Sequence, residues 1–219
     1  MACYYPGCKN QSKTDEHIPP KAFFPRDQRN QLITVRACEY HNTGKSQDDI
    51  YVLAHICLNS SPFNRSFQVF RERVVPQLSY NNDTFRKLLI NDAIPQSDGS
   101  VRYKVDIGRF NKFFTALSFG IIYKASCKSI PINYTPRHIY HNFQDDNESI
   151  EQKIIKEESL KFYSNMPSTI LNFGQIKALN QTIYSVNIYG ISEFKSSITI
   201  VHEFYGIFRV TSMITRNIE

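Results

Sequence analysis

Two short pairs of potential metal ligands occur near the start of this 219-residue sequence. Cys3 and Cys8 are separated by four residues, and Cys38 and His41 by two. Zinc binds thiolate and imidazole groups tetrahedrally, and such pairs on two distant tight turns are typical of a structural zinc site. We therefore predict a zinc ion held by Cys3, Cys8, Cys38 and His41. The alternative is reduced, half-buried cysteines without a metal.

A histidine beside a carboxylate, Glu16-His17, lies between the two pairs and is followed by Pro19 and Pro20. A histidine can accept a proton near neutral pH, and the two prolines restrict the backbone that follows it. The alternative interpretation is that His17 ligates the zinc in place of His41. Which interpretation holds depends on the other polar residues within reach of His17.

The order of these residues resembles the HNH endonucleases. Cys-x4-Cys is followed by EHIPPK at 16–21, NQLITV at 30–35 and CEYHNTGKS at 38–46. The resemblance covers residues 1–58 and implies a ββα-metal fold, in which two strands and a helix surround one catalytic divalent ion. The NTGKS segment is also similar to the start of the equivalent helix in the HNH domain of CRISPR effector nucleases.

The resemblance implies a role for four residues. His17 matches the general base that activates water, and Asn30 matches the asparagine that orients this histidine through a hydrogen bond. Glu16 stands where the family has Asp or another metal-binding residue, and Asn42 stands where His or Asn ligates the ion. The catalytic ion would therefore be held by Glu16 and Asn42.

These residue types also suit the hydrolysis of a phosphodiester bond. A neutral, oriented histidine such as His17 can take a proton from water. The oxygens of Glu16 and Asn42 are hard ligands of the kind that Mg²⁺ or Mn²⁺ prefers, whereas the cysteine set prefers zinc. We expect two metals, a structural Zn²⁺ and a catalytic Mg²⁺ or Mn²⁺, and we expect Lys45 and Arg36 to contact DNA phosphates.

Each of these residues also has a simpler interpretation. Glu16 could be a surface carboxylate, Asn30 could favour a turn, and Asn42 could cap a helix. Lys45 and Arg36 could be ordinary exposed cations. It is the order and spacing of the whole set that favours a nuclease.

Elements that would position this set can be predicted from the hydrophobic pattern. A short β-prone run occupies 32–35, and Asp48 or a neighbour opens a helix through 50–59 with apolar residues at helical spacing. Cys57 and Cys127 are predicted to lie in the core. The pattern leaves His55 as either a core or a surface residue.

The rest of the chain indicates a separate α+β region, with helices at 66–75 and 82–91 and a strand at 101–107. A stripe of large apolar residues predicts a core helix over 109–126. An acidic segment at 145–158 is interpreted as a solvated helix face. Three sheet strands are predicted at 182–190, 196–201 and 206–212, with Tyr184, Val186 and Ile188 on one face.

The predicted fold class is therefore α+β, with an N-terminal ββα-metal (HNH) module with structural zinc followed by an α+β domain with helices and a C-terminal antiparallel sheet. The nuclease domain is predicted over 1–60. An accessory domain over 61–219 would dimerise, position substrate or sense a ligand.

The bulk composition excludes some classes of protein. Hydrophobic residues are 41% and charged residues 21%, as in ordinary globular domains. We find no apolar run of about 18 residues and no signal peptide, so we expect a cytoplasmic protein without a membrane partner. Five cysteines, an odd number, argue against a disulfide framework. A net charge of +6 is compatible with DNA but does not require it.

The leading functional prediction is a metal-dependent HNH endonuclease that acts on DNA, in bacterial defence against phage or in a mobile element. It would act as a homodimer or with a partner protein of a defence system. The alternative is a catalytically inactive, zinc-stabilised module that binds nucleic acid or protein. A third interpretation makes sensing by the C-terminal domain the main function, with the nuclease as its output.

Overall fold

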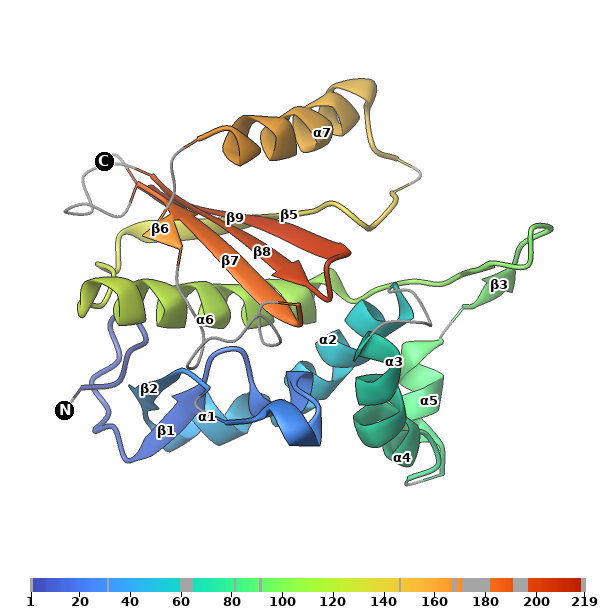
Figure 1. The fold of residues 1–219 in the computed structure, drawn as a ribbon, viewed down its shortest axis with the longest axis horizontal. Helices are drawn as coiled ribbons and strands as arrows, with labels where there is room; N and C mark the ends of the chain where they lie inside the picture. Colours follow the sequence, from blue (N-terminus) through green and yellow to red (C-terminus); the bar gives the residue numbers. More distant parts are fainter. Residues whose placement is uncertain are drawn as a thin grey trace.

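The predicted α+β fold is confirmed by the structure, a computed structural model that combines helices with a C-terminal antiparallel sheet (Figure 1). It describes residues 2–30, 32–59, 65–80, 82–90, 92–145, 147–166, 169–170, 182–190 and 197–217.

The N-terminal module contains two short strands followed by helices. Strand β1 (Thr14–His17) pairs antiparallel with β2 (Thr34–Ala37), and two 3₁₀ turns, η1 (Lys21–Phe23) and η2 (Arg26–Gln28), lie between them. Beyond β2, the short helix α1 (Glu39–Asn42) and the 3₁₀ turn η3 (Thr43–Lys45) lead into α2 (Ser46–Leu58). The predicted helix through 50–59 thus begins at Ser46, and Asp48 and Asp49 lie in its first turn.

Helix α2 is buried on almost every side. Leu53, Ala54 and Cys57 are buried, which confirms the predicted core position of Cys57, and His55 is completely buried as well. A helix that is buried all round belongs to the centre of a fold rather than to its surface. Helix α2 is therefore the scaffold on which the module is built.

A group of short helices follows: α3 (Arg65–Val69), the π-helical turn η4 (Phe70–Val74), α4 (Val75–Leu78) and α5 (Thr84–Leu89). They confirm the helices predicted at 66–75 and 82–91. Pro76 lies in the first turn of α4, where a missing N–H group costs little.

A narrow hairpin of β3 (Ile94–Pro95) and β4 (Val101–Arg102) projects from the body of the molecule (Figure 1). The strand predicted over 101–107 therefore ends at Arg102, and Ile107 already begins the next helix. Both strands of this hairpin are exposed, so no buried face extends the pairing.

The long helix α6 (Ile107–Ser126) confirms the helix predicted over 109–126. Its N-cap is Asp106, whose carboxylate accepts a hydrogen bond from the Arg109 backbone N–H at 3.3 Å. The helix ends at Cys127, which has a left-handed backbone (φ 57°) and an exposed side chain. The prediction that Cys127 lies in the core is therefore wrong, because the residue that ends this helix is turned out of it.

A five-stranded antiparallel sheet with the order β5-β9-β8-β7-β6 covers α6. The described strands are β5 (Tyr134–Tyr140), β6 (Thr169–Ile170), β7 (Tyr184–Tyr189), β8 (Ile198–Phe204) and β9 (Phe208–Arg216). The three predicted strands are confirmed, and Tyr184, Val186 and Ile188 are buried together on one face of β7.

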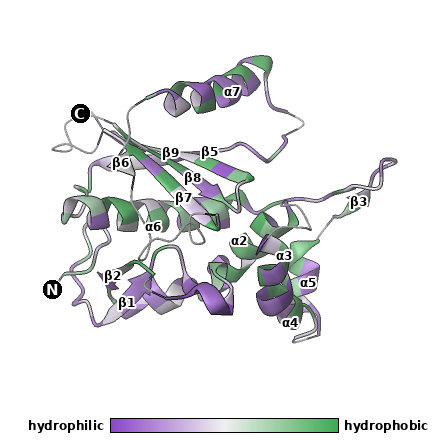
Figure 2. Ribbon diagram, viewed as in Figure 1, coloured by the Kyte–Doolittle hydropathy of each residue, from purple (hydrophilic) through white to green (hydrophobic). Residues whose placement is uncertain are grey.

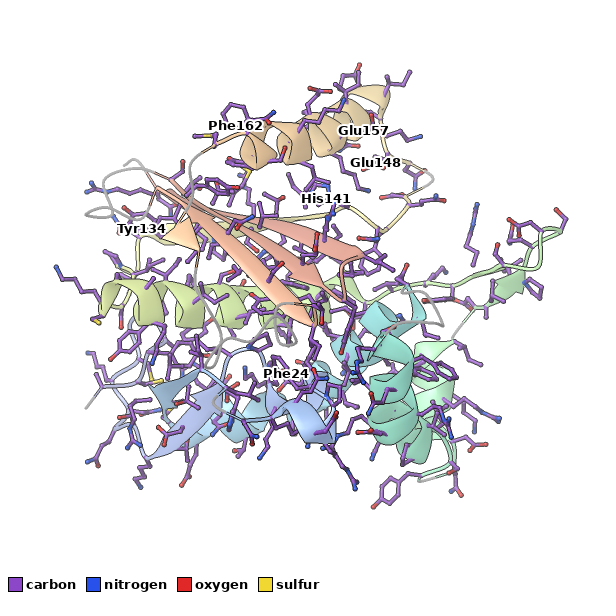
Figure 3. All side chains as sticks on the ribbon, viewed as in Figure 1. Phe24, Tyr134, His141, Glu148, Glu157 and Phe162 are labelled. Carbon is purple, nitrogen blue, oxygen red and sulfur yellow. The ribbon has the colours of Figure 1, made fainter. Side chains whose placement is uncertain are left out.

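Helix α7 (Ile150–Ser164) lies over the opposite face of this sheet, and His141 points into the space between them (Figure 3). The predicted solvated helix is confirmed, since no α7 side chain is fully buried. Tyr163 of α7 contacts the sheet, since its hydroxyl oxygen lies 2.9 Å from Oγ1 of Thr199. Among the described residues, no helix is both long and apolar enough to cross a lipid bilayer.

Helix α6 lies between the N-terminal module and the sheet, and hydrophobic residues alternate with hydrophilic ones along it (Figures 1 and 2). The helix approaches the module closely at Gly120, because a Cβ atom there would lie 2.9 Å from Cγ2 of Ile18. The Tyr205 hydroxyl also donates to the Phe23 carbonyl at 2.8 Å. Buried side chains from both halves form one core cluster, and the predicted boundary at residues 60 and 61 lies outside the described residues.

Candidate metal centre and adjoining carboxylate cluster

Four potential zinc ligands meet at one point, as the spacing of the two pairs predicts. The ligand atoms of Cys3, Cys8, Cys38 and His41 all lie within 4.8 Å of one another. Nδ1 of His41 is 3.2 Å from Sγ of Cys38 and 3.4 Å from Sγ of Cys3, and the Sγ atoms of Cys8 and Cys38 are 3.9 Å apart.

These distances fit one tetrahedral zinc ion. Zn–S bonds of about 2.3 Å and Zn–N bonds of about 2.0 Å place the ligand atoms of a tetrahedron about 3.5–3.8 Å apart. A disulfide would instead require sulfur atoms about 2.05 Å apart, and all four cysteines of the module are free. The donor set is soft and closed, which suits a structural ion rather than a catalytic one.

Local backbone structure explains why the pairs converge. Gly7 lies in the turn between Cys3 and Cys8 with φ of 69°, a conformation that residues with a Cβ atom rarely adopt. Cys38 is the N-cap of α1, so His41 follows on the first turn of that helix. The Tyr5 ring stacks on the His41 ring at 4.1 Å and holds it in place.

The electrostatics of the ligands differ from one ligand to the next. Burial raises the pKa of the Cys3 thiol to about 11, whereas His41 and Cys38 favour their metal-binding forms. Burial and the positive charge of Lys45 lower the pKa of His41, which favours the neutral imidazole that binds metals. Burial tends to raise the pKa of Cys38, but hydrogen bonds from the His41 backbone and from neighbouring side chains outweigh it, so the pKa lies below its usual value. Thiolate formation at Cys38 is thereby favoured.

Glu16 points into the protein from β1. Its side chain is only 3% exposed, and its Oε1 atom lies 2.6 Å from Nζ of Lys45, which is 17% exposed. Burial raises the pKa of Glu16, and the Lys45 ammonium opposes that rise. The expected divalent-ion ligand is thus already paired with a cation of the chain, and the predicted phosphate contact Lys45 is that cation.

A second carboxylate and a tyrosine adjoin this pair, and we refer to Tyr4, Glu16, Lys45 and Asp49 as the carboxylate cluster. Asp49 lies one helical turn after Lys45, and its Oδ1 atom is buried without a hydrogen-bond partner among the described residues. Burial raises the pKa of Asp49 to about 7, with Lys45 lowering it and Glu16 raising it. The Tyr4 hydroxyl is buried and has no partner among the described residues either.

His17 lies on the other face of β1, because side chains alternate along a strand. It is half-buried, and its strand partner is Thr34. Burial and the positive charge of Lys21 lower the pKa of His17, while Asp15 raises it. A neutral His17 is therefore favoured at physiological pH, as a general base requires.

The two predicted asparagines lie in different surroundings. Asn42, the last residue of α1, donates from Nδ2 to the backbone oxygen of Asp15 at 3.3 Å. This bond holds Asn42 beside the peptide bond that precedes Glu16, with its amide oxygen as the atom able to ligate a cation. Asn30 is exposed in the loop before β2, and no contact of its side chain with His17 is recorded in the described part of the chain.

Arg36 is paired on the surface of the hairpin. Its Nη1 atom lies 3.1 Å from Oδ1 of Asp15, and its Nη2 atom donates to the Ser12 carbonyl at 3.2 Å. Both charged side chains are substantially exposed, so the pair contributes little to stability. A phosphate could compete with Asp15 for the guanidinium.

Sequence reasoning missed two members of the carboxylate cluster, Tyr4 and Asp49. A signal for Asp49 was present, because Lys45 and Asp49 are four residues apart and therefore lie on one face of a helix. Tyr4 gave no such signal, since its position depends on how the N-terminal turn folds onto β2, where the Tyr4 N–H donates to the Arg36 carbonyl at 3.0 Å.

None of the protein families, curated proteins or solved structures compared with this chain matches it. The functional assignment therefore depends on the geometry of the zinc ligands, the carboxylate cluster and His17.

Proposed function

We propose that this chain is a metal-dependent endonuclease of the HNH type that hydrolyses phosphodiester bonds in DNA. The supporting observation is the arrangement of the module: an antiparallel β1-β2 pair followed by α2, with the potential zinc ligands gathered in the same module. Glu16 and His17 are adjacent on opposite faces at the end of β1, and Asn42 lies beside this strand. The order of the motif along the sequence supports the same assignment.

In this proposal the residues of the chain divide the chemistry between them. His17, neutral and half-buried, takes a proton from the attacking water. Glu16 and Asn42 supply hard oxygens for one Mg²⁺ or Mn²⁺, which when bound polarises the phosphate and stabilises the leaving oxygen. Asn30 is the proposed orienting residue, and its exposed position would require the loop before β2 to close over His17.

Substrate contact is proposed for the cations near this site. Arg36 is exposed enough to exchange Asp15 for a DNA phosphate, and the net charge of +6 favours a polyanionic partner. Lys45 can contact a phosphate only after it leaves Glu16. Cytoplasmic location, a homodimer or partner protein, and a role in phage defence or a mobile element belong to the same proposal.

The experiment is plasmid cleavage with Mg²⁺ or Mn²⁺ by the wild-type chain, His17→Ala and His141→Ala. His141 is the matched control, because it is also a half-buried histidine but lies by the C-terminal sheet. We expect the wild type and His141→Ala to cut and His17→Ala to lose about 10²-fold or more of the rate. Equal cutting by all three chains, or intact plasmid in every reaction, would contradict the proposal.

A zinc-stabilised binding module without activity is the second candidate, and one observation favours it. Glu16 is already neutralised by Lys45 at 2.6 Å, as in a structural ion pair. This candidate predicts salt-dependent DNA binding that is unaffected by Mn²⁺ and by His17→Ala. An electrophoretic mobility assay beside the cleavage assay separates the two candidates.

A further inference from the structure

The carboxylate cluster contains more hydrogen-bond acceptors than its cation, Lys45, can bind. Glu16 and Asp49 are two carboxylates, and in the part of the chain that the structure describes Lys45 is the one ammonium in contact with either, through its 2.6 Å bond to Glu16. Oδ1 of Asp49 and the hydroxyl of Tyr4, whose side chain is 0% exposed, are both buried without partners among the described residues. Such atoms cost free energy unless a ligand satisfies them.

These groups lie close enough to interact electrostatically with one another. Lys45 is the N-cap of α2, and Asp49 follows it in the first turn of that helix. The charges of both Glu16 and Lys45 act on the Asp49 carboxyl, and the charges of Glu16 and Asp49 both act on the Tyr4 hydroxyl. Tyr4 is thus a buried polar side chain, unpartnered among the described residues, within the electrostatic range of both carboxylates.

We propose that Glu16 and Asp49 form a divalent-cation site in which the Lys45 ammonium is the resident cation and a metal ion replaces it. This inference rests on the proposed function, in which Glu16 is a metal ligand, and adds Asp49 as a second carboxylate ligand and Lys45 as the group that must leave.

The exchange follows from charge and ligand chemistry. Two ionised carboxylates with one ammonium carry a net charge of −1, so above the pKa of Asp49, about 7, a doubly charged ion neutralises them better than Lys45 does. Mg²⁺ and Mn²⁺ prefer such hard oxygen ligands. Lys45 has a flexible stem and is 17% exposed, so its ammonium can move into solvent or onto a bound phosphate. Metal entry would thereby release a phosphate-binding group next to the scissile bond.

The test is Mn²⁺ binding to the full zinc-loaded chain without DNA, measured by calorimetry and by the Mn²⁺ electron paramagnetic resonance signal. Lys45→Met removes the resident cation and should tighten Mn²⁺ binding about tenfold or more, and Asp49→Asn should weaken it about tenfold or more. Asp48→Asn is the matched control, because the neighbouring Asp48 pairs with Arg109 at 2.9 Å instead. Its affinity should stay near that of the wild type.

Unchanged Mn²⁺ affinity in either Asp49→Asn or Lys45→Met would overturn the proposal and leave the cluster as a structural ion pair. Should Lys45→Met fail to fold, Lys45→Gln provides the same test with a polar head retained, and Lys45→Arg should not tighten binding.

Failure of the proposed function would give a different result. Binding changes as expected with no plasmid cleavage would contradict the nuclease alone, whereas Mn²⁺-dependent cleavage that is equal in Asp49→Asn and wild type, at matching affinities, would contradict this inference alone.

Discussion

The ring of Tyr5 lies 4.1 Å from the ring of the zinc-ligand candidate His41, with only 8° between their planes. The same Tyr5 ring meets Phe119 of α6 edge-on at 5.3 Å. The candidate metal centre is therefore packed directly against the helix that also supports the C-terminal sheet. Through this contact, loss of the metal should affect the stability of more than the first 60 residues.

Zinc removal is expected to destabilise the whole chain. We predict one zinc per chain, and we predict that Cys38→Ser loses it, because each ligand contributes to a binding free energy on the order of 10 kcal/mol. Metal analysis by mass spectrometry and thermal unfolding followed by circular dichroism check this prediction. Cys127→Ser is the control, since Cys127 is exposed and outside the ligand set. A folded wild-type chain with much less than one zinc would contradict it.

Gly120→Ala is expected to lower the free energy of unfolding by about 1–3 kcal/mol, the usual cost of overpacking a core. The new Cβ atom would lie 2.9 Å from Cγ2 of the fully buried Ile18, so the module would have to move away from α6. Urea unfolding measures this change. Gly44→Ala is the matched control, because its Cβ atom would meet only Tyr40 at 3.9 Å. A wild-type unfolding midpoint for Gly120→Ala would show that α6 does not pack against Ile18 as described.

His55→Leu is expected to raise the free energy of unfolding by about 1–3 kcal/mol at pH 7.5. His55 is 0% exposed, and neither of its ring nitrogens has a hydrogen-bond partner among the described residues. Leucine removes the two unsatisfied ring nitrogens and fills the same aromatic surroundings with an apolar side chain of similar size. Urea unfolding at pH 7.5 measures the gain, and a loss of stability would mean that His55 has a polar partner in solution.

Acid sensitivity should fall in the same His55→Leu variant. Burial lowers the pKa of His55 to about 4 from an ordinary 6.5. Between these values the unfolded chain binds a proton that the folded chain does not, so stability decreases as the pH falls from about 6.5 to about 4. His55 contributes up to about 1.4 kcal/mol per pH unit to this loss. Unfolding midpoints at pH 7.5 and 5.0 should therefore differ less in His55→Leu than in the wild type, and equal differences would refute the assignment.

Local sequence signals were sufficient for the convergence of Cys3, Cys8, Cys38 and His41 and for most helices and strands. The Cys-x4-Cys and Cys-x2-His spacings are properties of single turns, and the apolar stripe of α6 is a property of one helix. Strand β5 was missed because it contains Pro136 and several polar residues. The sheet tolerates Pro136 because β5 lies at its edge.

Tertiary packing determined what the sequence could not show at the site. The pairing of Glu16 with Lys45 joins residues that are far apart in the sequence. The burial of the Oδ1 atom of Asp49 likewise depends on what packs against the start of α2. His55 shows the same limit. Its helical position was compatible with core or surface, and the folding of α6 against α2 decided in favour of the core.

Chemical rescue of His17→Ala by imidazole tests the central claim most directly. His17→Ala removes a half-buried imidazole ring and leaves a space that free imidazole can enter. Free imidazole has a proton affinity close to that of the missing side chain. We predict that millimolar imidazole restores Mn²⁺-dependent plasmid cleavage by His17→Ala by about tenfold or more, with a rate that rises as imidazole loses its proton, and leaves the wild-type rate unchanged. Cleavage by His17→Ala that equals the wild-type rate, or that does not respond to imidazole at any pH, would contradict His17 as the general base of a nuclease.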